Sequence, residues 1–197
     1  LHRLDPLHVD IDGVFVHTRG IGPTSLVSVQ ADVVNDLNQQ NSGSAYMYIA
    51  DRNGKKLSQS PETPFTLDAQ GKTTLKQELI LRSPRLWSLE DPYLYRLVTV
   101  VRKGKTVADT LETRFGVRQI EISASQGLLL NGKPVKVQGV NCHQDHAGVG
   151  SALPDELQYY RIRLLKELGV NAYRASHNPP TPELLDACDS LGMLVMD

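Results

Sequence analysis

The chain has 197 residues, enough for one large domain or two small ones. Its 21 basic and 22 acidic side chains nearly cancel, so no charge argument favours a nucleic acid or an anionic membrane as a partner. No apolar run approaches the ~18 residues of a membrane-spanning helix, so none is expected.

Residues 7–122 alternate between apolar and polar side chains, as half-buried β-strands do. Turn residues separate the runs, and short strands over about 110 residues with no helical period predict an immunoglobulin-like β-sandwich. The cysteine pair of antibody domains is absent. The expected strands cover 8–16, 25–33, 45–49, 74–81, 94–101 and 107–115, and the expected turns lie at 20–23, 41–43, 53–54 and 103–105.

The single tryptophan, Trp87, precedes a turn at 90–92, and we interpret it as a hydrophobic plug beneath a crossover loop rather than a binding residue. Three histidines are scattered along the same region, and we expect all three at the surface: His2, His8 and His17.

The periodicity changes from Gln119 onward. A small hairpin turning on Asn131 and Gly132 precedes a predicted strand at 135–140. Residues 155–168 follow as an amphipathic helix, and its apolar face is expected to contain Leu157, Tyr160, Leu164, Leu165 and Leu168.

A second strand begins shortly after Gly169, and Thr181 and Pro182 open a second helix as its cap and first residue. Gly192 closes that helix, whose Leu184, Leu185 and Cys188 should face inward, and another strand starts at Leu194. Strand, helix, strand, helix, strand predicts a parallel α/β sheet. We therefore expect a sandwich domain over residues 1–117 and an α/β region over 118–197.

Polar side chains gather where the first two parallel strands end. His143, Asp145 and His146 follow the first strand, and Arg174 and His177 end the second. Barrel enzymes keep their chemistry at this edge. Imidazole both donates and accepts hydrogen bonds, which suits sugar hydroxyls, and arginine can hold a carboxylate by bidentate pairing. Two alternatives stay open: ordinary polar loops, or a metal site formed by His143, Asp145, His146 and His177.

Several chemistries lack their usual residues. No nucleophile elbow, P-loop or dinucleotide-binding motif occurs, so no cofactor is expected. Cys142 and Cys188 are too few for a disulfide framework, and we expect free, buried thiols. Glycoside hydrolysis needs two carboxylates, but the acids of the second helix should face outward and none is assigned that role: Glu183, Asp186 and Asp189.

Residues 139–145 (GVNCHQD) followed by 171–180 (NAYRASHNPP) resemble glycoside hydrolase family 2. The second segment is similar to the family's first signature and continues to residue 197, and residues 129–134 (LLNGKP) are also characteristic. A weaker likeness of layout covers the sandwich. The HNPP form at 177–180 is similar to bacterial β-galactosidases, whereas β-glucuronidases generally carry Tyr at the position of Asn178.

The resemblance implies a jelly-roll domain before Leu1, then an immunoglobulin-like sandwich, then a (β/α)8 barrel of which this chain holds the first third. It also implies two catalytic glutamates beyond Asp197, so the chain itself would contain no catalytic residue and would be inactive. His143 and His177 would hydrogen-bond the terminal sugar, Arg174 would hold the nucleophile's carboxylate, and Asp145 would support the His143 loop.

We therefore expect a fragment of a retaining exo-β-glycosidase, a β-galactosidase acting on β-galactosides, with no bound metal; the sequence does not assign its compartment. The alternatives are a β-glucuronidase of the same family and a non-catalytic β-sandwich module that binds carbohydrate or protein. Unpaired strand edges in a partial barrel should be sticky, so self-association or a homo-oligomer is expected.

Overall fold

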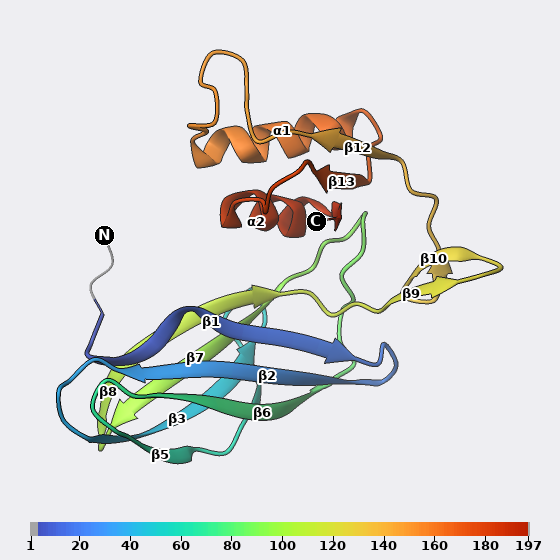
Figure 1. The fold of residues 1–197 in the computed structure, drawn as a ribbon. Helices are drawn as coiled ribbons and strands as arrows, with labels where there is room; N and C mark the ends of the chain where they lie inside the picture. Colours follow the sequence, from blue (N-terminus) through green and yellow to red (C-terminus); the bar gives the residue numbers. More distant parts are fainter. Residues whose placement is uncertain (1–3, 197) are drawn as a thin grey trace. The chain divides into compact units, whose positions relative to one another are not determined.

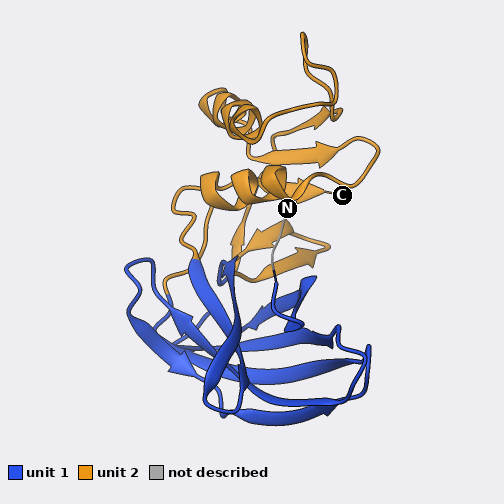
Figure 2. Cartoon of the chain, turned by 90° about the vertical axis from the view of Figure 1, so that its left-hand side faces the viewer, with its two compact units in different colours: residues 1–84, 95–117 blue, residues 85–94, 118–197 orange. Residues whose placement is uncertain are grey.

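A computed structural model describes residues 4–196 and divides them into two compact units (Figures 1 and 2). Unit 1 contains residues 4–84 and 95–117, and unit 2 contains residues 85–94 and 118–196. The segment 85–94 thus packs with unit 2, although it lies between two strands of unit 1 in the sequence. The two units are therefore not separated by a single boundary near residue 117, since residues 85–94 also belong to unit 2.

Unit 1 consists of two antiparallel sheets with strand orders β1-β2-β6 and β4-β3-β7-β8, the latter with β5 paired to β3. This arrangement confirms the predicted immunoglobulin-like sandwich. The strands are β1 (Leu7–Arg19), β2 (Thr24–Asn35), β3 (Asn41–Ala50), β4 (Lys56–Gln59), β5 (Thr63–Leu67), β6 (Lys72–Arg82), β7 (Tyr95–Lys103) and β8 (Thr106–Phe115).

The core of unit 1 follows from the alternation along its strands, because successive side chains of a strand point to opposite faces. Val27 and Val29 of β2 are at most 1% exposed, as are Met47 and Ile49 of β3. Burial of each such aliphatic side chain contributes about 1.5–3 kcal/mol. The sandwich is therefore held chiefly by the inward positions that the sequence pattern identifies.

The expected turn at 41–43 is wrong, since β3 begins at Asn41 and the chain reverses at 36–40 instead. A Cβ added to Gly43 would lie 2.6 Å from the carbonyl oxygen of Arg102. Glycine is therefore needed here for the close approach of two strands. The strands β4 and β5 were not predicted, since they are only four and five residues long.

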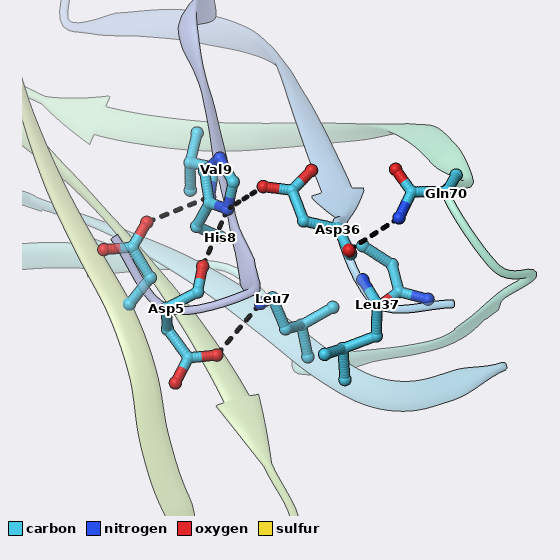
Figure 3. A network of polar contacts seen from close by, with 9 residues as sticks. Asp5, Leu7, His8, Val9, Asp36, Leu37 and Gln70 are labelled. Carbon is cyan, nitrogen blue, oxygen red and sulfur yellow. Dashed lines mark hydrogen bonds and ion pairs between the residues drawn. The ribbon is translucent and has the colours of Figure 1, made fainter. Parts of the chain in front are cut away.

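His8 is only 6% exposed, so its predicted surface position is wrong. Its Nδ1 atom lies 2.8 Å from the carbonyl oxygen of Asp5 and 3.9 Å from Oδ2 of Asp36, two contacts drawn as dashed lines in Figure 3. The neighbouring Leu7 N–H donates to Oδ1 of Asp5. These contacts fix the start of β1. His17 is exposed as expected, and His2 lies outside the described residues.

Unit 2 starts with a three-stranded antiparallel sheet of order β11-β10-β9. Asn131 and Gly132 have φ values of 53° and 75°, the left-handed pair that a two-residue hairpin turn requires. The predicted hairpin is therefore confirmed. Its strands are β9 (Ile120–Ser123), β10 (Gly127–Leu130) and β11 (Lys133–Pro134).

The rest of unit 2 is a parallel sheet of order β12-β13-β14 with helices in the connections, which confirms the start of a TIM barrel. The first strand is shorter than predicted, because residues 135–138 do not join the ladder. Instead, Oδ1 of Asn171 accepts from the Gln138 N–H, and its Nδ2 donates to the Lys136 carbonyl. The elements are β12 (Gly139–Cys142), α1 (Asp155–Glu167), β13 (Ala172–Ala175), α2 (Pro182–Leu191) and β14 (Leu194–Met196).

The two helices share one core with the sheet. On α1 the buried residues are Gln158 and Ile162, while Tyr160 and Leu164 are 50% and 39% exposed. The predicted apolar face is therefore wrong for Tyr160, Leu164 and Leu168, whereas Leu165 packs against the core as expected. The predicted face and the face that is buried both contain apolar residues, and contact with β13 and α2 decides which face is buried.

Helix α2 begins and ends as the sequence predicts. The Thr181 side chain accepts from the Leu184 N–H, Pro182 is the first helical residue, and Gly192 closes the helix with φ of 76°. Leu184 and Cys188 are buried, but Leu185 is 40% exposed, so its inward assignment is wrong. Among residues 4–196, no helix is long and apolar enough to cross a bilayer.

Trp87 is fully buried and packs with Leu89, Leu130 and Leu194 of unit 2. Its indole N–H donates to the Asp189 carbonyl at 2.7 Å. The expected plug role is confirmed, but the core that Trp87 fills belongs to unit 2. The segment 85–94 is also anchored by Lys166, whose Nζ donates to the carbonyls of Leu89 and Gly192, each at 2.9 Å.

Candidate functional site at the carboxyl ends of the parallel strands

The predicted site residues follow two neighbouring strands at the same edge of the parallel sheet. Cys142 at the end of β12 pairs with Ala175 at the end of β13. His143 comes directly after Cys142, and His177 comes two residues after Ala175. The two imidazole rings lie edge to face, with centroids 5.5 Å apart and an angle of 81° between their planes. The structure therefore brings these two histidines together.

Arg174 lies on the sheet face opposite the helices. Its neighbours Tyr173 and Ala175 are buried in the helix core, so alternation directs Arg174 to the other side, where it is exposed. Asn141 of β12 and Met196 of β14 occupy the paired positions. This face corresponds to the interior of a barrel, and Arg174 stands on it directly below the strand ends that carry the histidines.

Ser176 connects Arg174 with the end of β12. The Arg174 Nη1 donates to the Ser176 hydroxyl at 3.1 Å, and the Ser176 N–H donates to the Cys142 carbonyl at 3.1 Å. Ser176 is only 2% exposed, so the serine end of this connection is buried while the Arg174 end is exposed. One of the five N–H groups of the Arg174 guanidinium is thereby used to orient its side chain. The peptide bond from Ser176 to His177 is cis.

The loop that carries His143 is held by α1. Arg161 donates from Nη1 to the His143 carbonyl at 3.0 Å and from Nη2 to the Asp145 carbonyl. Asp145, which is exposed, takes part in this arrangement through its main chain. His146 turns back on its own loop, with Nδ1 3.0 Å from the Ala147 carbonyl oxygen.

The turn that carries His177 is linked to the His143 loop by Gln144. The Gln144 Nε2 donates to the Pro179 carbonyl at 2.5 Å and lies 3.5 Å from the Asn178 carbonyl. The same turn continues into α2 through the Thr181 cap. Sequence reasoning identified neither Gln144 nor Arg161, because their partners are main-chain carbonyls, which leave no mark in a sequence.

Tyr173 lies beneath these loops and is only 1% exposed. Burial raises the pKa of its hydroxyl, while the neighbouring Arg161 acts in the opposite direction. The phenol of Tyr173 and the guanidinium of Arg161 therefore lie next to each other beneath the site.

The donor set suits a polyhydroxylated ligand better than a metal ion. Within residues 4–196, no three His, Cys, Asp or Glu side chains gather closely enough to hold a metal, so His143, Asp145, His146 and His177 do not form one. Two imidazoles and a guanidinium offer hydrogen-bond donors and acceptors at one edge. Asp189, an acidic residue of α2, forms an ion pair with Arg118: its Oδ1 lies 3.8 Å from Nη1 of Arg118.

Known proteins resemble this chain along its whole length. A β-galactosidase of Bacteroides ovatus, BoGH2A, is 32% identical over 198 residues, which cover 100% of this chain and 23% of that protein. The crystal structure of a glycosyl hydrolase family 2 member from Bacteroides cellulosilyticus superposes with a TM-score of 0.92 at 37% identity, over 98% of this chain and 27% of that one. For a β-glucuronidase of Bacteroides uniformis the TM-score is 0.88 at 31% identity, over 96% and 24%.

The chain thus spans about a quarter of the length of these relatives. Two family models divide it in sequence. The model of glycosyl hydrolases family 2 matches residues 9–118, and the model of that family's TIM barrel domain matches residues 120–197. The chain belongs to glycosyl hydrolase family 2.

Proposed function

We propose that this chain supplies part of the sugar-binding site of a retaining exo-β-glycosidase that acts on β-galactosides. The observation that carries the proposal is the edge-to-face pair of His143 and His177, 5.5 Å apart where adjacent parallel strands end. In barrel enzymes this edge holds the substrate. Imidazole can both donate to and accept from the hydroxyl groups of a terminal sugar.

The other two residues act beside this pair. Arg174, on the inner face of the sheet, holds the carboxylate of the nucleophile, and Asp145 borders the His143 loop. The nucleophile and the acid/base are glutamates of later barrel strands, beyond Asp197. One protonates the leaving oxygen while the other attacks the anomeric carbon, and water then hydrolyses the glycosyl-enzyme.

A β-galactoside is favoured by the sequence after His177. Asn178 and Pro179 give the turn the form found in bacterial β-galactosidases, and the B. ovatus relative carries that name. A β-glucuronide is the second candidate, because the similar B. uniformis structure is named a β-glucuronidase. The two substrates differ in charge: a glucuronide presents a carboxylate that needs a cationic partner, whereas galactose presents a neutral hydroxymethyl group.

The test is hydrolysis by a polypeptide that contains residues 1–197 together with a complete barrel. Nitrophenyl β-galactoside should be cleaved with a kcat/KM at least tenfold above that of nitrophenyl β-glucuronide, a difference of about 1.4 kcal/mol in transition-state stabilisation. His143→Gln and His177→Gln should each raise KM or lower kcat, while His17→Gln in the sandwich should change neither. A preference for the glucuronide would overturn the substrate, and unchanged kinetics of both site variants would overturn the site.

A further inference from the structure

Two polar side chains hold the loop that presents His143. Arg161, on α1, donates to the carbonyls of His143 and Asp145. Gln144, inside the loop, donates to the carbonyl of Pro179 in the neighbouring turn at 2.5 Å. The loop is thereby tied both to the helix layer and to the turn that carries His177.

The chemistry of these contacts is specific to the residue types. The planar guanidinium of Arg161 satisfies two carbonyls at once, which the single ammonium of a lysine cannot do in the same geometry. Arg161 is adjacent to the fully buried Ile162 and interacts with the buried Tyr173, so its side chain starts from a fixed base. Gln144 presents an N–H group to the Pro179 carbonyl, and a carboxylate of the same shape would present only acceptors there.

We propose that Arg161 and Gln144 are positioning residues that fix the distance and angle between the His143 and His177 rings. Neither residue needs to touch the sugar. Each acts through main-chain carbonyls, so that the two imidazoles are already arranged before the ligand arrives, which lowers the ordering cost of binding. The geometric part stands on the contacts alone, and the consequence for sugar binding rests on the proposed function.

The experiment uses the 197-residue chain with isotope-labelled histidines and two readouts. The first is the nuclear Overhauser cross-peak between the ring protons of His143 and His177, which an edge-to-face contact produces. The second is the affinity for galactose, read from the same ring signals. Four variants are compared: Arg161→Met, Arg161→Lys, Gln144→Glu and, as a matched control on an exposed arginine of the same helix, Arg163→Met.

Arg161→Met and Gln144→Glu should abolish the cross-peak and weaken galactose binding about tenfold, as the loss of one or two hydrogen bonds of about 1 kcal/mol each would. Arg161→Lys should restore part of the cross-peak, and Arg163→Met should change nothing. Dispersed amide signals of β13 and α2, recorded on a second, uniformly isotope-labelled sample of each variant, show that the variant is folded. If Arg161→Met does not fold, the decision rests on Arg161→Lys and Gln144→Glu.

The outcomes separate the two ideas. A cross-peak that persists in folded Arg161→Lys and Gln144→Glu at wild-type intensity overturns the positioning role, whether or not galactose binds. Loss of the cross-peak together with an absence of galactose binding in every form, wild type included, retains the positioning role and overturns the proposed function instead.

Discussion

Replacement of Trp87 by alanine should lower the stability of unit 2 more than that of unit 1. Trp87 lies between two strands of the sandwich in the sequence, yet it is fully buried against Leu89, Leu130 and Leu194 of unit 2. The substitution therefore tests which unit this segment stabilises.

The structure sets the size of the effect. Truncation of a buried Trp or Phe to alanine costs about 3–5 kcal/mol. The substitution also leaves the Asp189 carbonyl without its 2.7 Å indole donor. We expect a loss of about 4 kcal/mol, a large part of the 5–15 kcal/mol that stabilises a typical domain. Trp87→Phe retains most of the packing and should cost about 1–2 kcal/mol, for the hydrogen bond alone.

The assay is hydrogen exchange in increasing urea, followed by mass spectrometry of peptides from each unit. Peptides from β13 and α2 should lose protection at a urea concentration about 2 M lower in Trp87→Ala, since unfolding of a small domain changes by about 2 kcal/mol per molar urea. Leu97→Ala, in the core of unit 1 where Leu97 is 0% exposed, should produce the opposite pattern. A Trp87→Ala chain in which β2 and β3 lose protection first would refute the assignment of the segment to unit 2.

Three further predictions concern unit 2 and the chain as a whole. In urea titrations, Gly192→Ala should lower the free energy of unfolding by about 1–3 kcal/mol more than Gly169→Ala does. Both glycines have positive φ, but only at Gly192 would the added Cβ lie 2.3 Å from a carbonyl oxygen, that of Leu89. Equal costs would contradict the close approach. Burial raises the pKa of the Cys188 thiol to about 12 from 9.0, so the unfolded chain loses this proton at a lower pH than the folded chain does. The free energy of unfolding should therefore fall as pH rises from about 9 towards 12. In Cys188→Ala the midpoint of urea unfolding should depend less on pH over this range. Finally, the purified 197-residue chain should release no nitrophenol from nitrophenyl β-galactoside, and turnover that co-elutes with the chain would refute the placement of both catalytic glutamates beyond Asp197.

Local chemistry made much of the fold predictable. The left-handed pair Asn131 and Gly132 and the capping residues Thr181 and Gly192 act through their own backbone preferences, so their roles can be read from the sequence. Alternation along β2 and β3 likewise identifies the sandwich core, because it depends only on which face a side chain points to.

Features set by distant contacts could not be predicted. Gly43 looked like a turn residue, but glycine is needed there because the Arg102 carbonyl of the neighbouring strand leaves no room for a side chain. His8 looked like a surface residue because Asp36, one of its two partners, becomes a neighbour only when β1 and β2 pair. The buried face of α1 depends on what packs against it, and both of its stripes contain apolar residues.

The site divides in the same way. The positions of His143, Arg174 and His177 at strand ends followed from the strand-helix pattern, since parallel strands end at a common edge. The supports of that edge, Arg161 and Gln144, were missed because they bind main-chain carbonyls. Such supports can be found only once the loops have coordinates.

The central claim is that His143 and His177 form one sugar subsite, and a galactose titration of the histidine-labelled chain tests it directly. The ring signals of both residues should shift along saturable curves with a single common dissociation constant, while the exposed His17 of unit 1 stays unchanged. Signals of His143 and His177 that do not move, or that move no more than that of His17, would contradict the claim.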